Sequence, residues 1–131
     1  LSYPDSLAAI HALKTELSQN NKHLALFGQE RGSALQGILG NLDQTFDGVS
    51  LYPSCAERAA HLLYFIIKDH PFSDGNKRIA SLLFLVQLRQ DSLSLNKIND
   101  NCLVALTLLV AQSHPNQKDT MIQLIIGLLQ S

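Results

Sequence analysis

Along most of the chain, hydrophobic and polar positions repeat with the period of an α-helix. Pro4 and Asp5 are suited to the first turn of a helix, and apolar residues recur every three to four positions after them. The polar residues 19–21 end this pattern. A second helical pattern covers residues 22–30, where a glycine weakens it. The N-terminal part therefore predicts a long helix followed by a short helical piece.

Residues 33–53 have a different pattern. Gly37, Gly40 and Gly48 each destabilise a helix by about 1 kcal/mol relative to alanine. Asp47 and Gly48 form a pair that is typical of tight turns, and apolar residues follow them. This stretch therefore predicts a short β-hairpin, or flap.

Strongly apolar helical patterns resume after this stretch. Ser54 can cap a helix, with Glu57 three residues later in a capping box. Apolar residues surround most of this helix, which predicts a central, buried position, and the helix must end before Pro71. The later patterns predict three more helices, at residues 76–90, from Asn99 or Asp100 to Ala111, and at residues 119–129. Together these elements predict an all-α bundle with one small hairpin.

Length and composition fit one domain over residues 1–131, although a chain that begins with Leu1 rather than Met can also be a fragment of a longer protein. Hydrophobic residues make up 46% of the sequence, enough for a core, and the net charge is −1 with histidine neutral. Such a charge does not favour nucleic acid or anionic membranes. No apolar run is long enough to span a bilayer, so we expect a cytoplasmic protein or one delivered as an effector.

Cysteine and histidine residues do not suggest a metal centre. Cys55 and Cys102 lie in apolar helical patterns and are expected to be buried free thiols. No pair of cysteine or histidine residues has the spacing of a zinc site. His61, within the predicted central helix, is interpreted as a packing residue.

One polar loop, HPFSDGNKR from His70 to Arg78, separates the two most apolar helical patterns. The helix after it starts near Asn76, so its free N–H groups and positive dipole end face the loop, an arrangement that binds phosphate. Lys77 and Arg78 add positive charge at the same helix end. A helix N-terminus favours acidic residues, so this basic pair indicates a bound anion.

The other side chains of the loop provide further parts of phosphoryl chemistry. Gly75 allows the backbone to approach a ligand closely. Asp74 is a hard oxygen ligand, suited to Mg²⁺ that is carried by nucleotide phosphates. His70 titrates near neutral pH and can take a proton from an attacking hydroxyl. An ordinary connection between two helices, with Ser73 or Asp74 as the N-cap, accounts for the same residues without any chemistry.

The loop resembles the signature of the Fic/Doc (Fido) family, H-x-F-x-[DE]-G-N-G-R-x-x-R. Six residues match this signature in order: His70, Phe72, Asp74, Gly75, Asn76 and Arg78. The family is a helical bundle with the motif between two central helices and a β-hairpin flap upstream. The resemblance therefore implies a Fic-type all-α bundle in which a flap from Gly37 to Leu51 precedes the motif.

The resemblance also implies a role for each matching residue. His70 would act as general base on a Ser, Thr or Tyr hydroxyl of a target protein, and Asp74 would bind Mg²⁺. Phe72 would be buried and would anchor the loop. The residues that would bind the phosphates of ATP are Gly75, Asn76, Lys77 and Arg78. The flap would bind the target protein by strand addition.

Two departures from the signature leave the reaction open. Lys77 replaces the second glycine of the signature, and Ser81 replaces its final arginine, which binds the γ-phosphate in members that transfer AMP. The resemblance implies Mg²⁺-dependent transfer of AMP from ATP to a protein hydroxyl. Lys77 is similar to the Doc branch, so a kinase that transfers the γ-phosphate, as a toxin controlled by an antitoxin, is the second reading.

A third reading is an inactive domain that binds a nucleotide or a partner. The [ST]-x-x-x-E-[GN] pattern, which forms an inhibitory helix in many family members, does not occur in the sequence. Regulation would then come from a separate inhibitor or from sequence outside this chain.

Overall fold

The computed structural model describes residues 1–20, 24–93 and 98–130, and these residues are mostly helical. The helices of this described part are α1 (Tyr3–Asn20), α2 (Ala34–Leu42), α3 (Cys55–Asp69), α4 (Asn76–Gln90), α5 (Asp100–Gln112) and α6 (Lys118–Gln130). A short 3-10 helix, Pro115–Gln117, leads into α6, and the strands β1 (Thr45–Phe46) and β2 (Val49–Ser50) pair antiparallel. The predicted all-α bundle with one small hairpin is confirmed.

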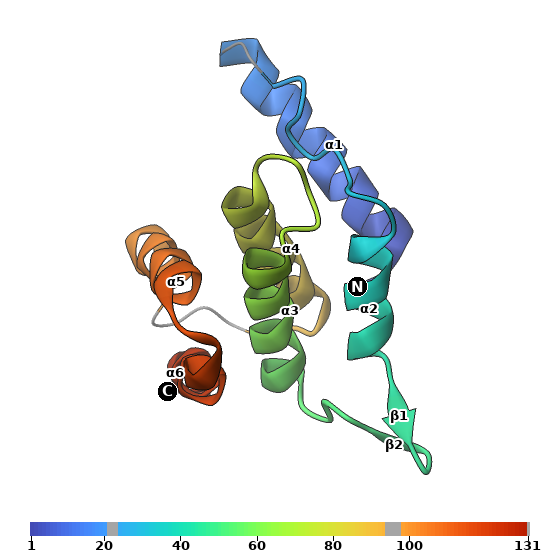
Figure 1. Cartoon of the computed structure of the whole chain (residues 1–131), viewed down its shortest axis with the longest axis vertical. Helices are drawn as coiled ribbons and strands as arrows, with labels where there is room; N and C mark the ends of the chain where they lie inside the picture. The colour runs from blue at the N-terminus through green and yellow to red at the C-terminus, as the bar shows by residue number, and fades with distance from the viewer. Residues whose placement is uncertain (21–23, 94–97, 131) are drawn as a thin grey trace.

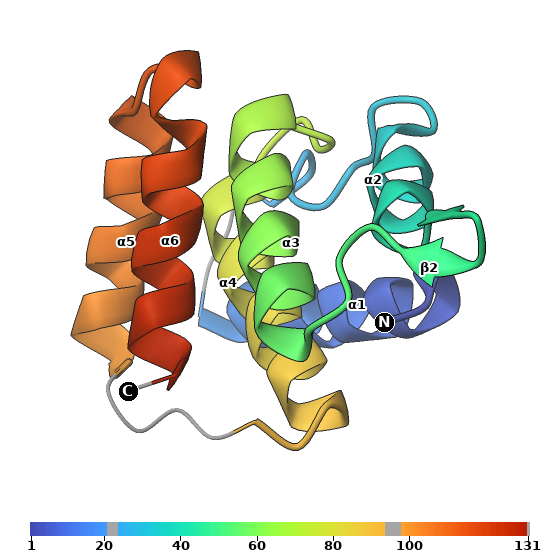
Figure 2. The ribbon, with the colours of Figure 1, turned by 90° about the horizontal axis from the view of Figure 1, so that it is seen from below.

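Helix α3 is the centre of the bundle, as its apolar pattern predicts. It contacts α4 most extensively and also packs against α2, α5 and α6. In Figure 1, α1 and α2 lie on one side of α3 and α4, whereas α5 and α6 lie on the other. Figure 2 shows α5 and α6 alongside α3, on the side away from α2. The core residues of α3 that are fully inaccessible to solvent are Ala59, Ala60, Leu62, Leu63 and Ile66.

The ends of the helices follow the capping residues of the sequence. The Ser54 hydroxyl accepts a hydrogen bond from the backbone N–H of Glu57 at 3.0 Å and begins α3. The Asn99 side chain accepts one from the N–H of Cys102 at 2.8 Å and begins α5. Helix α3 ends at Asp69, two residues before Pro71, as predicted. Local capping therefore sets these boundaries.

The helical piece predicted for residues 22–30 is wrong over its described part, residues 24–30; residues 22 and 23 lie outside the described part of the chain. The segment makes turns and two isolated bridges, Phe27 with Asp74 and Glu30 with Phe72. Gly28 has φ +70° and would place a Cβ 2.8 Å from a side-chain carbon of Ile10. Backbone pairing with a distant loop therefore replaces the local helix.

The hairpin predicted for residues 33–53 is too long, because its first part forms helix α2. Gly37 and Gly40 have ordinary helical geometry, with open space where a Cβ would lie. Burial of an aliphatic side chain contributes roughly 1.5–3 kcal/mol, against about 1 kcal/mol lost per glycine. The buried residues of α2 are Leu35, Ile38, Leu39 and Leu42. Their burial therefore outweighs the low helix propensity of the two glycines.

The hairpin itself forms at the predicted turn, where Asp47 and Gly48 both have positive φ, 51° and 78°. It lies at the opposite end of α3 from the polar loop (Figure 1). The hairpin precedes the first residue of α3 and the loop follows its last, and a helix of 15 residues is about 22 Å long. The hairpin is therefore not next to the loop.

Both cysteines are free, as predicted, but they are partly exposed rather than buried. Among the described residues, no helix combines the length and the apolar character that crossing a bilayer requires.

The two serines at the starts of α2 and α3 provide a test of capping. Ser54 accepts a cap hydrogen bond, whereas the side chain of Ser33, at the N-cap of α2, makes none. We expect Ser54→Ala to lower the free energy of unfolding by about 1 kcal/mol and Ser33→Ala to leave it nearly unchanged, as measured by urea unfolding. Equal losses at the two positions would contradict a stabilising cap at Ser54.

Candidate functional site

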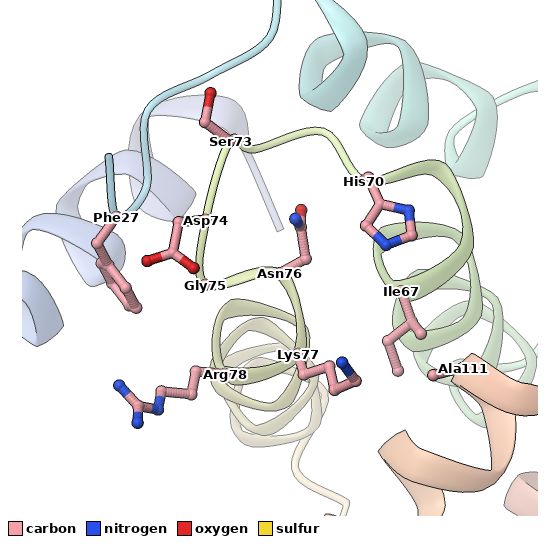
Figure 3. A pocket seen from close by; sticks show the side chains of 10 residues that line it. All are labelled: Phe27, Ile67, His70, Ser73, Asp74, Gly75, Asn76, Lys77, Arg78 and Ala111. Carbon is pink, nitrogen blue, oxygen red and sulfur yellow. The ribbon is translucent and has the colours of Figure 1, made fainter. Parts of the chain in front are cut away.

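An open pocket of about 600 Å³ lies where the polar loop meets α3, α4 and α5. Figure 3 shows the residues that line it: Phe27, Ile67, His70, Ser73, Asp74, Gly75, Asn76, Lys77, Arg78 and Ala111. Every polar or glycine residue proposed for the site from the sequence is in this group. Phe72 is not, because its side chain is 1% exposed and lies in the core.

The polar loop is hydrogen-bonded through its backbone to residues 28–31, most of which were expected to be helical. Gly28 donates its N–H to the carbonyl of Asp74 at 3.1 Å. Ser73 donates to the carbonyl of Gln29, and Arg31 donates to the carbonyl of Pro71, both at 2.8 Å. These bonds fix the backbone of the loop from 71 to 74. In the sequence, Gly28 indicated only a weakened helix; in the structure, it has the left-handed conformation that glycine favours.

The side chain of Asn76 closes the loop on itself. Its Oδ1 accepts a hydrogen bond from the N–H of Phe72 at 3.0 Å, and its Nδ2 donates to the carbonyl of Phe72 at 2.8 Å. Phe72 is thus bonded through both backbone groups and buried through its ring. The side chain of Asn76 therefore stabilises the loop, and its backbone N–H has no hydrogen-bond partner among the described residues.

Gly75 is required by the turn from the loop into α4. It is the N-cap residue of α4 and has φ +85° and ψ 15°, a left-handed conformation that favours glycine. A Cβ at this position would overlap the aromatic ring of Phe27. The ring of Phe27 can thus pack against the backbone because residue 75 is glycine.

The N-terminus of α4 has free backbone donors. The first hydrogen bond into the helix runs from Ile79 to the carbonyl of Gly75 at 2.8 Å. Within the described chain, the N–H groups of Asn76, Lys77 and Arg78 have no partner. No side chain caps this end and no acidic residue occupies its first turn. Free donors and the positive end of a helix dipole are features that favour the binding of an anion.

The two basic side chains at this helix end point to different sides of the pocket. In Figure 3, Lys77 extends toward Ile67 and Ala111, on the side of His70. Arg78 extends the opposite way, to the side where Phe27 and the carboxylate of Asp74 lie. Both side chains are exposed, and neither makes an ion pair with another described residue. Positive charge is therefore available on both sides of an anion at the start of α4.

His70 is placed at the C-terminus of α3 with its ring at the pocket. It has φ 50° and ψ 61°, and its N–H bonds to the carbonyl of Ile66 at 3.3 Å. Its Nδ1 lies 3.2 Å from the carbonyl oxygen of Lys68. Because a carbonyl oxygen only accepts, this contact requires the proton on Nδ1, and a neutral ring then has no proton on Nε2. In this tautomer, Nε2 of a neutral His70 is the ring nitrogen that can accept a proton.

Asp74 presents a free carboxylate on a loop whose backbone is fixed. Its side chain is exposed and makes no ion pair or hydrogen bond with another described residue. No group of three or more His, Cys, Asp and Glu residues comes together as a metal site in the described part of the chain. A divalent cation at Asp74 would therefore take its other ligands from substrate phosphates and water, which is the usual mode for Mg²⁺.

Ser81 lies outside the pocket, one helical turn beyond Lys77 on α4. Its side chain is half-buried. The position of the final arginine of the signature therefore offers no cation to the pocket in this chain.

His61 has a structural role, as the sequence suggests. Its Nδ1 lies 2.7 Å from the carbonyl oxygen of Glu57, and its ring centroid lies 4.3 Å from that of Tyr52, with the two rings tilted by 44°. Burial is the main cause that lowers the pKa of the His61 imidazole, which favours its neutral form. This histidine does not line the pocket of His70.

Comparison with known sequences identifies one family. The sequence model of the Fic/DOC family matches residues 3–88, which is more than half of the chain. The match includes the whole polar loop and ends within α4, so α5 and α6 lie beyond it. No curated protein and no solved structure matches the chain.

Two glycines with different surroundings test the turn into α4. Gly75→Ala places a methyl group against Phe27 at a left-handed residue, and we expect it to lower the free energy of unfolding by about 1–3 kcal/mol. Gly37→Ala, in open space within α2, should raise it by up to about 1 kcal/mol. Urea unfolding of the two variants measures both effects. A Gly75→Ala variant as stable as the parent chain would show that the turn does not need glycine.

Proposed function

Because the chain belongs to the Fic/DOC family, we propose that it transfers a phosphorus-containing group from ATP with Mg²⁺ to a hydroxyl group of a target protein. The observation that supports this most is the uncapped N-terminus of α4 beside His70. It offers free backbone donors and two cations to a polyphosphate, next to a base. AMP, the group that the family resemblance implies, is the first candidate for transfer.

The pocket fits a nucleotide in size and chemistry. Its volume of about 600 Å³ falls within the roughly 300–1,000 Å³ of small-molecule sites. The phosphates would bind the N–H groups of Asn76, Lys77 and Arg78, as well as the two basic side chains. Mg²⁺ bound by Asp74 and the phosphates would offset part of the negative charge that develops on the leaving group.

The reaction of this site begins at the Nε2 atom of His70. Nε2 takes the proton from the target hydroxyl as the hydroxyl oxygen forms a bond to phosphorus. The bond from that phosphorus to the bridging oxygen breaks, and Lys77 and Arg78 stabilise the negative charge on the phosphate oxygens. The leaving group is pyrophosphate when the α-phosphorus is attacked and ADP when the γ-phosphorus is attacked.

One observation favours transfer of the terminal phosphate as a second candidate. Lys77 lies on the His70 side of the pocket. Its ammonium group could therefore neutralise the phosphate that is attacked near His70. If the α-phosphate lay next to His70 and Lys77, the β- and γ-phosphates would need a second cation further along α4. Residue 81, which carries arginine in the family signature, is Ser81 here. Lys77 and Arg78, which line the pocket, therefore both belong to the first turn of α4, and the position one turn further along carries no charge.

Capture of the target at the hairpin is part of the proposal and requires a long target segment. The hairpin exposes Phe46, Val49 and Leu51 by 71%, 64% and 45%, so an apolar segment can dock there. The hairpin and His70 lie at opposite ends of α3, about 22 Å apart along its axis. An extended segment covers this distance with about seven residues at ~3.3 Å each.

The position of the label in ATP distinguishes the two reactions. The chain is incubated with a cell lysate, Mg²⁺ and ATP labelled at either the α- or the γ-phosphate, and labelled protein is counted. We expect transfer, with AMP transfer giving label only from the α-position and phosphate transfer giving it only from the γ-position. His70→Ala should reduce transfer at least about 100-fold, because it removes the base. His11→Ala, an exposed histidine on α1, is the matched control and should have no effect.

Two outcomes would contradict this account. Transfer that survives in His70→Ala would exclude His70 as the base. A chain that binds ATP in equilibrium dialysis but transfers neither label would be a binding domain without the proposed activity.

A further inference from the structure

Lys68 connects the C-terminus of α5 to the ring of His70. Its ammonium group donates hydrogen bonds to the carbonyl of Ala111, at 3.4 Å, and to the carbonyl of Ser113. The carbonyl oxygen of the same residue lies 3.2 Å from Nδ1 of His70. One residue in the last turn of α3 therefore contacts another helix with its side chain and the candidate base with its backbone.

Lys68 donates hydrogen bonds to carbonyl groups at the C-terminus of α5. The last carbonyls of a helix have no partner within the helix and are negative because of the dipole. Helix α5 has no basic residue in its own last turn. Lys68, which is half-buried between the helices, supplies the cation from α3. The position of α5 against α3 is therefore linked to the position of Lys68.

Helix α5 is also part of the wall of the pocket. Ala111 lines the pocket, and in Figure 3 it lies beside Ile67 on the His70 side. This helix lies beyond residue 88, where the family match ends. The wall nearest the candidate base is thus completed by a part of the chain that the family model does not include.

We propose that Lys68 is a positioning residue for His70, through which docking of α5 sets the tautomer of the imidazole. Without the ammonium group, the last turn of α3 loses its bonds to α5, and the contact between Nδ1 and the Lys68 carbonyl is no longer fixed. The neutral ring then also adopts the tautomer with a proton on Nε2, which cannot accept one from a hydroxyl. The proposal rests on the function proposed for His70, although the tautomer can be observed without turnover.

Lys118 is the matched control for Lys68. It also joins the C-terminal helices to α3, since its Nζ lies 4.8 Å from the ring centroid of Phe65 and 5.9 Å from that of Tyr64. It makes no contact with His70. A variant of Lys118 therefore weakens the same packing of helices without affecting the link to the candidate base.

The experiment compares the full chain with Lys68→Met, Lys68→Arg and Lys118→Met, each labelled with ¹⁵N-histidine. Imidazole ¹⁵N spectra, recorded where the rings are neutral, separate a nitrogen that bears a proton from one that does not; the signals that vanish in His70→Ala belong to His70. We expect an Nε2 without a proton in the parent chain, in Lys68→Arg and in Lys118→Met. Lys68→Met should show a mixture of tautomers.

Transfer kinetics provide the second measurement. We expect kcat of Lys68→Met to fall at least about tenfold, since small misplacements of a reacting group cost up to roughly 100-fold. Its KM for ATP should stay within about twofold of the parent value, because Lys68 lies outside the proposed phosphate site. Lys68→Arg keeps the cation and should restore kcat, and Lys118→Met should leave it unchanged.

Three results would overturn the proposal: an unchanged His70 spectrum in Lys68→Met, a failure of Lys68→Arg to restore it, or an equal change in Lys118→Met. If Lys68→Met does not fold, Lys68→Gln replaces it, and an unchanged spectrum there would overturn the proposal equally. A parent chain that shows the expected tautomer but transfers no label would contradict the proposed function and leave the positioning role supported.

Discussion

The chain must turn from the end of α3 to the start of α4 within residues 70–75, and the candidate site depends on this turn. A left-handed residue lies at each end of it, His70 with φ 50° and Gly75 with φ 85°. Between them, the buried ring of Phe72 and its two hydrogen bonds to Asn76 stabilise the loop. The turn brings the imidazole at the end of one helix beside the free N–H groups at the start of the next.

That geometry carries an electrostatic cost, which a bound anion would offset. The first turn of α4 has a positive dipole end, no acidic residue and no side-chain cap, and it carries Lys77 and Arg78 as well. Each of these features disfavours the empty site, because like charges and free donors are brought together. A polyphosphate would pair with all of them at once. The same reasoning explains why an acidic N-cap, the usual stabiliser of a helix start, is absent here.

How much could be predicted from the sequence depended on how local each feature is. The six residues that match the signature all lie between His70 and Arg78, and Ser54 and Pro71 mark the ends of α3, so the sequence alone indicated the loop and the two helices beside it. The pairing of Gly28 with Asp74 joins residues far apart in the chain, and no periodicity indicates it. Helix α2 was missed because burial, a tertiary effect, outweighs the propensity of its glycines.

The pocket joins three layers of the bundle, and this explains why its shape could not be derived from the motif alone. Phe27 reaches it from the segment that follows α1, Ile67 and His70 belong to the end of α3, and Ala111 comes from α5. The motif supplies the chemical groups, whereas the two outer layers determine the walls. Chains with the same motif can therefore differ in what their pockets accept, because the residues at these walls lie outside it. In this chain, Lys68 bonds the wall that α5 forms beside His70 to α3. The same residue therefore takes part in the packing of α5 and in the contact with the candidate base.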